Sequence, residues 1–365
     1  MFLKDFHIIR PDFEEKQEAL LDWILNAHVQ VEPEEDAEFA EKLRENLFKL
    51  GLGENKIKTR GFQLDDCSHR NWDEMKIYNL NSAKEGYQLD KRMAFFDEAA
   101  SSVFEKMYPE DKALPPHLVH VTCTGYVAPS PAQKLVSLRE AGAQTTVTHA
   151  YHMGCYAAIP AIRMAMGHYA VEDESTDIVH TEICSLHMNP SLHTIEQLVV
   201  QSLFADGFIK YTLGDADPSP SLKILGVLEE VIPNSISKMT WTPHQWGFQM
   251  SISKDIPVLI RRNLEGYLKR LGKKAGYEDL KNARYAIHPG GPKIIEQIAA
   301  QLELGPEQIQ YSKEILQSCG NMSSATLPHV WEKMVRDPEV KPGELIVSLA
   351  FGPGLSISGA LFEKR

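Results

Sequence analysis

The sequence lacks the features of disulfide-rich secreted proteins, cysteine-based metal centres and membrane-spanning proteins. It has five cysteines, an odd number, and no C-x-x-C pair, which favours a reduced protein inside the cell. No apolar run approaches the ~20 residues that cross a bilayer. The formal net charge of −12 argues against a nucleic acid or an anionic membrane as the main partner. We therefore expect a soluble, cytoplasmic protein.

What the sequence does contain is an ordinary globular composition, 43% hydrophobic and 24% charged, over 365 residues. That length allows two domains or one large duplicated domain. Strand-like runs alternate with helical segments, and the alternation restarts after the linker Asp215-Ala-Asp-Pro-Ser-Pro-Ser221. We expect two successive α/β halves, residues 1–220 and 221–365, with layered helices and a site between the halves.

The expected helices and strands follow from periodicity, capping residues and breakers. Helices are expected at residues 12–25, 34–50, 90–107, 194–204, 256–271, 293–302 and 306–317, and also from residue 155 onward and from residue 321 to 335. Strands are expected at residues 6–9, 117–124, 145–148, 178–184, 224–232, 285–287, 343–350 and 355–362. Each half then carries its chemical candidates on turns between a strand and a helix.

The first of these turns carries Cys155. Gly154 supplies a sharp turn, and Cys155 stands where an apolar, alanine-rich helix is expected to begin. A thiol at a helix N-terminus faces unpaired N–H groups and the positive end of the helix dipole, and both favour the thiolate. The alternative is that a small apolar cysteine beside glycine only packs in the core. This stretch alone leaves both interpretations open.

Two further turns carry a histidine and an asparagine. His288 ends a strand and is followed by two prolines and two glycines, which fix its backbone path. Asn321 lies in a turn of small residues, where it could also serve as a helix cap or adopt the left-handed conformation. A cysteine, a histidine and an asparagine on three such turns form a stronger signal than any one of them.

These motifs resemble the signatures of type III polyketide synthases, the chalcone- and stilbene-synthase-like enzymes of the thiolase superfamily. The resemblance covers roughly residues 80 to 362. Its main motifs are His288-Pro-Gly-Gly-Pro292, Gly320-Asn-Met-Ser-Ser-Ala325 and Phe351-Gly-Pro-Gly-Leu355, and the first two together are rarely seen elsewhere. Shorter matches in the right order are Gly154-Cys155, Leu203-Phe-Ala-Asp-Gly207 and Lys254-Asp-Ile-Pro257. Departures from the plant pattern point to a bacterial-type enzyme.

The resemblance implies a thiolase-like duplicated αβαβα fold, a homodimer and a decarboxylative condensation of malonyl-CoA onto an acyl starter. Cys155 would be the nucleophile that holds the growing chain as a thioester. His288 would keep it as thiolate and, with Asn321, donate hydrogen bonds to the malonyl thioester carbonyl. No metal and no permanently bound cofactor is implied, only coenzyme A thioesters as substrates. The product would be a pyrone, a resorcinol or a related polyketide.

The resemblance also assigns pocket residues. Phe204 matches the aromatic gate between entrance tunnel and cavity, Met250 replaces the second gate aromatic, and Trp241 would narrow the cavity. The remaining pocket candidates are Cys184, His187, Ser323, Phe351 and Pro353. The basic residues that hold the coenzyme A phosphates in plant members are not matched. Lys56, Lys58 and Arg60 are the candidate substitutes, so delivery of the starter by an acyl carrier protein is an equal alternative.

Other functions remain open at this stage. An initiating ketoacyl carrier-protein synthase shares the Cys-His-Asn set but makes a single condensation. A degradative thiolase would need a second acid–base cysteine, and Cys319 stands in the wrong context for it. A Cys-His-Asn hydrolase lacks any matching local signature here. A non-catalytic partner subunit of a synthase would have no need of Cys155, His288 and Asn321 together.

Overall fold

The computed structural model describes residues 1–32 and 37–365. Within these residues, nine strands form one mixed sheet in the order β11-β12-β13-β8-β1-β7-β6-β4-β5. Their bounds are β1 Phe2–Ile9, β4 His117–Thr122, β5 Thr146–Tyr151, β6 Thr176–Glu182, β7 Gly207–Gly214, β8 Leu222–Val231, β11 Arg284–Ile287, β12 Leu345–Gly352 and β13 Ser356–Lys364. Two further two-stranded sheets pair β2 (Phe13–Lys16) with β3 (Thr59–Phe62), and β9 (Met239–Pro243) with β10 (Phe248–Ile252).

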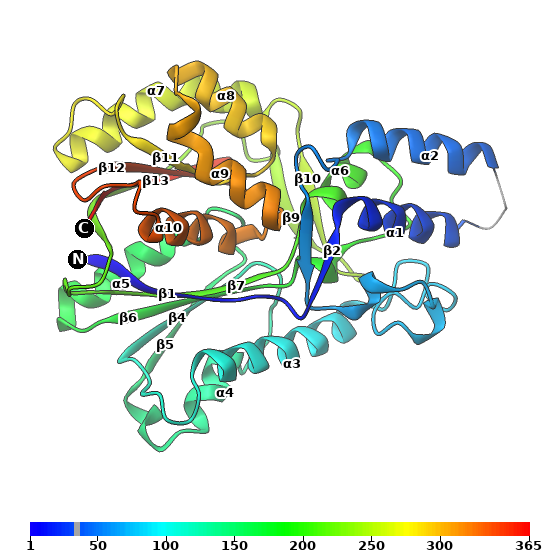
Figure 1. Cartoon of the computed structure of the whole chain (residues 1–365). Helices are drawn as coiled ribbons and strands as arrows, with labels where there is room; N and C mark the ends of the chain where they lie inside the picture. Colours follow the sequence, from blue (N-terminus) through cyan, green and yellow to red (C-terminus); the bar gives the residue numbers. More distant parts are fainter. Residues whose placement is uncertain (33–36) are drawn as a thin grey trace.

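Helices cover both outer faces and fill the space between the two halves. They are α1 Gln17–Gln30, α2 Ala37–Leu50, α3 Leu89–Met107, α4 Pro131–Ser137, α5 Ala158–Glu172, α6 Ile195–Leu203, α7 Ile256–Ala275, α8 Pro292–Leu302, α9 Pro306–Cys319 and α10 Thr326–Arg336. Figure 1 shows α7 and α8 outside β11 to β13, α5 and α10 in the middle, and α3 and α4 beyond β4 and β6. This order of layers confirms the predicted α/β fold of thiolase type.

Helix α5 can lie in the middle layer because its buried side chains are small or compact. Ala158, Ala161 and Ala165 are fully buried, as are Ile159 and Ile162. The helix contacts β4 and β6 from the first half as well as β8 and β13 from the second. Since alanine lets backbones approach closely and costs little side-chain entropy in a helix, the Ala-rich sequence suits a helix packed between two layers of strands.

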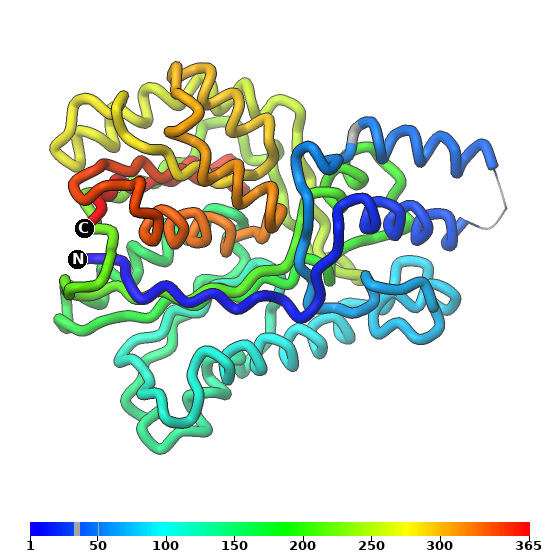
Figure 2. The backbone as a smooth tube through the Cα atoms, in the orientation of Figure 1, coloured from blue at the N-terminus to red at the C-terminus, as the bar shows by residue number. Residues whose placement is uncertain are grey.

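Strand β1 lies between the strands of the two halves. It pairs antiparallel with β7 along most of its length and with β8 through Phe2–Lys223 and Leu3–Leu222. Figure 2 traces this strand, in blue, through the centre of the molecule. The predicted boundary near residue 220 falls between β7 and β8, on either side of β1. The division into two domains stays a prediction.

Most predicted elements are present, with shifted ends, and some predictions are wrong. The helix predicted from residue 12 begins at Gln17, because Phe13–Lys16 pairs with β3 instead. The predicted start of the next helix at Glu34 lies outside the described residues. Strand β7 was not predicted at all. Its buried Lys210 and Thr212, which contact Asp177, interrupt the apolar run that marks a central strand. Among the described residues, no helix has both the length and the apolar character to cross a bilayer.

Candidate active site

Three chain turns bring Cys155, His288 and Asn321 to the wall of one cavity, which we call the outer cavity. Phe204, Met250 and Phe351 line it as well. Cys155 follows β5, His288 follows β11, and Asn321 follows α9. The empty space measures about 1460 Å³ and includes open solvent at the mouth. The sequence placed these three residues on separate turns in two halves of the chain, and the structure brings them together.

The turn that carries Cys155 is fixed by its glycine. Gly154 has φ +87°, in the left-handed region that side chains rarely adopt, and a Cβ there would lie 2.6 Å from Cδ of Pro353. Only glycine therefore fits between the cysteine turn and the Phe351–Pro353 loop. Pro353 is not part of the cavity wall in this structure. It packs against the back of the turn that presents Cys155.

Burial, and not a helix end, dominates the electrostatics of Cys155. Its side chain is 7% exposed, and burial raises the pKa of the thiol to about 12, while hydrogen bonds from Ser323 and Asn321 favour the thiolate. Its Sγ lies 3.9 Å from Oγ of Ser323. The first residue of α5 is Ala158, three positions later. The helix therefore starts three residues later than predicted, and burial favours the neutral thiol over the thiolate.

His288 is a buried imidazole with open hydrogen-bonding capacity. It is 2% exposed, and neither ring nitrogen has a hydrogen-bond partner among the described residues. Burial lowers its pKa to about 3, so the ring is neutral. Its backbone N–H donates to the carbonyl of Leu349 in β12 (2.7 Å), and Gly291 then turns the chain into α8. A neutral ring held this way can donate one hydrogen bond and accept another.

Asn321 is oriented by its own turn. Its Oδ1 accepts a hydrogen bond from the backbone N–H of Ser323 at 2.9 Å, which leaves the amide NH₂ as the group available to a ligand. A β-bridge joins Asn321 to Phe204, with Ala205 N–H donating to the Asn321 carbonyl. This bridge ties the turn that carries Asn321 to the end of α6 in the other half.

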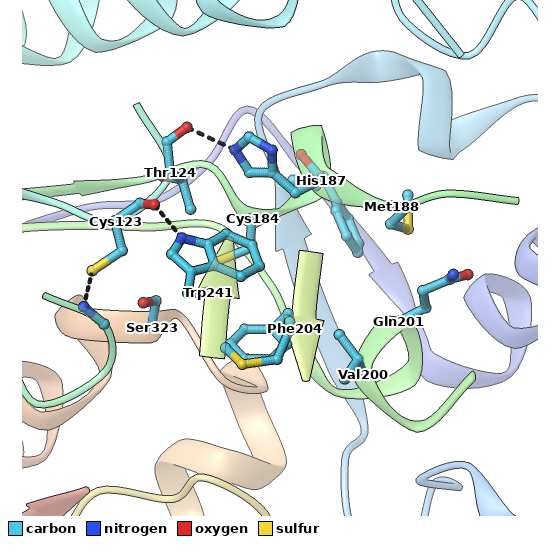
Figure 3. A pocket seen from close by; sticks show the side chains of 14 residues that line it. Cys123, Thr124, Cys184, His187, Met188, Val200, Gln201, Phe204, Trp241 and Ser323 are labelled. Atoms are coloured by element: carbon cyan, nitrogen blue, oxygen red, sulfur yellow. Dashed lines mark hydrogen bonds between the residues drawn. The ribbon is translucent and has the colours of Figure 1, made fainter. Parts of the chain in front are cut away.

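A second cavity, which we call the inner cavity, adjoins the first; Figure 3 shows side chains that line it. Val200, Phe204 and Met250 line both cavities and therefore form their common wall. The empty space of the inner cavity measures about 540 Å³ and includes open solvent. Of the predicted pocket residues, those that line it are Phe204, Met250, Trp241, Cys184, His187 and Ser323. Met250 and Trp241 are opposite partners in the β9–β10 hairpin, which explains why both reach the same space.

The polar side chains of the inner cavity are already satisfied by protein partners. His187 Nε2 donates to the carbonyl of Thr124 (2.7 Å), and its Nδ1 accepts from the backbone N–H of Phe248 (3.1 Å). The indole N–H of Trp241 donates to the carbonyl of Cys123 (2.6 Å), as Figure 3 shows. Burial lowers the pKa of His187 to about 3. His187 is thus a fixed, neutral part of the wall.

A buried carboxylate that was not predicted from the sequence, Glu182, contacts two of the neighbouring turns. Its oxygens accept hydrogen bonds from the backbone N–H of Cys123 (3.0 Å), from Thr124 Oγ1 (2.9 Å) and from Ser324 Oγ. Glu182 therefore joins the ends of β4 and β6 to the turn that carries Asn321. An acid in the buried run 178–184 was the available signal, since buried carboxylates need several donors.

The predicted basic cluster is not one site. Arg60 is 1% exposed and donates to Gln17 Oε1 (2.7 Å) and to the carbonyls of Gln201 (2.8 Å) and Phe204 (2.6 Å). It holds the end of α6 and cannot reach a ligand, so its assignment to coenzyme A was wrong. Lys56 pairs with Glu296 at 2.7 Å, and Lys58 is exposed.

Two other lysines line the outer cavity itself, Lys254 and Lys293. Both are exposed, and within the described residues neither makes an ion pair at the distances of a salt bridge. Lys254 was noted in the sequence as part of a motif, but no role was predicted for either lysine. The lysines that line the outer cavity therefore come from the segment before α7 and from the first turn of α8.

Comparison with known proteins gives a consistent result. Residues 223–364 match the family model of chalcone and stilbene synthases, C-terminal domain. The chain is 27% identical over 337 residues to probable polyketide synthase 1 of Dictyostelium discoideum; this match covers 89% of the chain but only 10% of that relative. The chain thus spans about a tenth of the length of the curated relative that it matches.

Solved structures resemble the chain over nearly its whole length. The C-terminal type III polyketide synthase domain of Steely1, a type I/III hybrid from Dictyostelium, is 25% identical, with a TM-score of 0.83 and coverage of 99% and 98% of the two chains. PKS-I from the brown alga Ectocarpus siliculosus is 21% identical (TM-score 0.84, coverage 100% and 98%). The 1,3,6,8-tetrahydroxynaphthalene synthase of Streptomyces coelicolor A3(2) is 20% identical (TM-score 0.82, coverage 100% and 99%). The last two show the shared fold.

Proposed function

We propose that the chain is a type III polyketide synthase that condenses malonyl-CoA units onto an acyl starter held on Cys155. The match of residues 223–364 to chalcone and stilbene synthases and the similarity to the Steely1 domain support this proposal. The observation that carries this proposal is the outer cavity, where a thiol, an imidazole and a carboxamide face the same buried space. The substrates are coenzyme A thioesters, and the reaction calls for no permanently bound cofactor. The protein acts in the cytoplasm as a homodimer.

The first step loads the starter. The thiol proton of Cys155 passes to His288 as the sulfur attacks the starter's thioester carbonyl, and the imidazole returns the proton to the departing coenzyme A sulfur. Burial opposes a standing thiolate–imidazolium pair, since it raises the thiol pKa to about 12 and lowers the imidazole pKa to about 3. Proton transfer therefore accompanies the attack and does not precede it.

The second step generates the carbon nucleophile. The malonyl thioester oxygen accepts hydrogen bonds from the Asn321 amide and from the N–H of His288. As the carboxylate leaves as carbon dioxide, the electrons of the broken C–C bond form an enolate, and its negative oxygen is stabilised by these two donors. The enolate carbon attacks the acyl group on Cys155. Collapse of that adduct expels the sulfur and leaves a chain longer by two carbons.

The cavities suggest how the chain is then handled. Phe204 and Met250 stand between the reacting groups and the inner cavity, whose walls Trp241, Cys184 and His187 complete. Growth of the chain past this boundary, into a small space with satisfied polar walls, favours a short polyketide that cyclises to a pyrone or resorcinol. Lys254 and Lys293 at the outer cavity suit the phosphates of coenzyme A or the phosphopantetheine of a carrier protein.

Product analysis tests this function. Purified protein is incubated with malonyl-CoA and a panel of acyl-CoA starters, and products are identified by mass spectrometry. We expect multiply extended products from the wild-type protein and none from Cys155→Ala, whereas Cys155→Ser loads starter slowly because a hydroxyl is far less ionised.

Two outcomes would contradict the proposal. Condensation by Cys155→Ala at the wild-type rate would exclude the thioester mechanism. A singly extended product under excess malonyl-CoA would identify an initiating ketoacyl synthase instead. A folded Cys67→Ala variant serves as the matched control, because Cys67 is buried and lines neither cavity.

A further inference from the structure

At the end of α5 away from Cys155, one histidine and two glutamates come together. His117 is the first residue of β4, Glu172 is the last residue of α5, and Glu174 lies in the turn that leads to β6. One ligand atom from each lies within 4.8 Å of the others. Asp173 between the glutamates has φ +57°, and this left-handed residue reverses the chain after the helix.

His117 is buried without the hydrogen bonds that a buried imidazole normally makes. It is 3% exposed, and among the described residues neither of its ring nitrogens has a hydrogen-bond partner. Its Nε2 nevertheless lies 2.9 Å from Oε2 of Glu172 and 3.9 Å from Oε2 of Glu174. The oxygen of Glu172 is thus within hydrogen-bond distance of Nε2 but at an angle that does not allow a hydrogen bond.

This off-axis position is the one expected around a metal ion. An ion on the lone-pair axis of Nε2, at ~2.0–2.1 Å, leaves neighbouring ligands beside that axis and not on it. A second imidazole, that of His168, lies beside His117. His168 stands one turn before Glu172 on α5, and the centres of the two rings are 4.6 Å apart. Its Nδ1 is also buried without a hydrogen-bond partner among the described residues.

We propose that His117, Glu172 and Glu174 bind one divalent transition-metal ion of the zinc class. One imidazole with two carboxylates suits zinc, cobalt and manganese better than magnesium or calcium, which prefer oxygen ligands alone. Both glutamate side chains are 52% exposed. They can adjust to the ligand spacing of the ion and leave one position for water.

The ion would be structural. It joins the start of β4, the end of α5 and the turn before β6, and β4 and β6 are paired at this end through His117 and Thr176. Helix α5 has 15 residues and is therefore ~22 Å long, which separates this site from Cys155 at the other end. The site is independent of the proposed condensation chemistry.

Metal binding tests the proposal directly. Chelator-treated protein carrying Cys155→Ala, which removes the thiol of the outer cavity, is titrated with Co²⁺ and with Zn²⁺. We expect one ion per chain, a Co²⁺ spectrum without thiolate charge-transfer bands, and a melting temperature that rises with Zn²⁺ and falls again with chelator. Glu174→Gln should weaken binding at least ~10-fold, and Glu172→Gln with Glu174→Gln should abolish it.

The control is Glu105→Gln, an exposed carboxylate on α3, which should bind the ion as the parent protein does. Equal binding by the parent and the double variant would overturn the proposal, as would thiolate bands in the cobalt spectrum. So would a double variant that changes only the pH dependence of melting, because the cluster would then be an ion pair. The amide substitutions are on exposed side chains, and melting without metal reports whether each variant folds.

Discussion

The outer and inner cavities share a wall, yet they differ in how their histidines are used. His288 in the outer cavity has two ring nitrogens without partners among the described residues. His187 in the inner cavity has both nitrogens bonded to backbone groups. Burial leaves both rings neutral. An unsatisfied buried group costs stability unless a ligand completes it. This difference agrees with the proposal that condensation takes place in the outer cavity and that the inner cavity sets the shape of the product.

The largest effect should come from the outer cavity. Asn321→Ala removes one of two donors to the enolate oxygen, and we expect malonyl-CoA decarboxylation to fall about 10²–10³-fold. Starter loading, measured as acyl-enzyme by mass spectrometry, should fall much less. His288→Ala should reduce both steps, because the ring also moves the thiol proton. If the two variants impaired loading equally, the separate roles would be refuted.

A change in the inner cavity should alter the product without changing the rate of decarboxylation. Trp241→Gly enlarges that space and should shift products toward more extensions at a similar decarboxylation rate. It also leaves the Cys123 carbonyl without its donor, at a cost of about 1–3 kcal/mol in unfolding free energy. Trp241→Phe is the matched control, because it loses the donor but keeps most of the bulk. An unchanged product from the glycine variant would contradict the inner cavity's role in setting chain length.

The buried, neutral His187 should contribute to the pH dependence of the free energy of unfolding. The pKa of His187 is about 3 in the folded chain and ~6.5 when unfolded, so the unfolded chain takes up the proton first as pH falls. The stability contribution is complete above pH ~6.5 and is lost toward pH 3, with a slope of at most about 1.4 kcal/mol per pH unit. In urea titrations at pH 7, 6 and 5, His187→Gln should show a shallower loss than wild type. An identical slope would contradict this, because it would mean that His187 has the same pKa in the folded and the unfolded chain.

The smallest effect should appear at the mouth of the outer cavity. Lys293→Ala removes one exposed charge, and we expect KM for malonyl-CoA to rise about two- to fivefold at low salt, with kcat unchanged. Lys58→Ala is the matched control, since Lys58 lines neither cavity, and its KM should stay at the wild-type value. Equal effects of the two substitutions would indicate a general influence of net charge.

The sequence predicted the parts of the site that depend on local backbone geometry. Gly154 was assigned a sharp turn, and its φ of +87° agrees. His288 was expected at a strand end before a helix, and it follows β11 and precedes α8. Such turns can be predicted from sequence because few residues other than glycine adopt a positive φ, and because proline fixes its own φ.

The burial and hydrogen bonding of side chains that depend on contacts between distant segments of the chain could not be predicted. Arg60 appeared to belong to a surface cluster, but the pairing of β3 with β2 and its contacts with α6 bury it. Glu182 acquires its donors only when β4 and the turn after Asn321 meet β6. The protonation of Cys155 likewise depends on surrounding residues that the local sequence does not reveal.

The central position of β1 has a consequence for translation. A nascent chain presents residues 2–9 long before the ribosome has made residues 207–214 and 222–223, with which they pair. Until then this segment is an open strand, and Lys4 and Asp5 within it supply the charges that discourage pairing with other chains. Such distant pairing slows folding. Removing these two charges should therefore lower the yield of newly made protein more than it lowers the stability of the finished molecule.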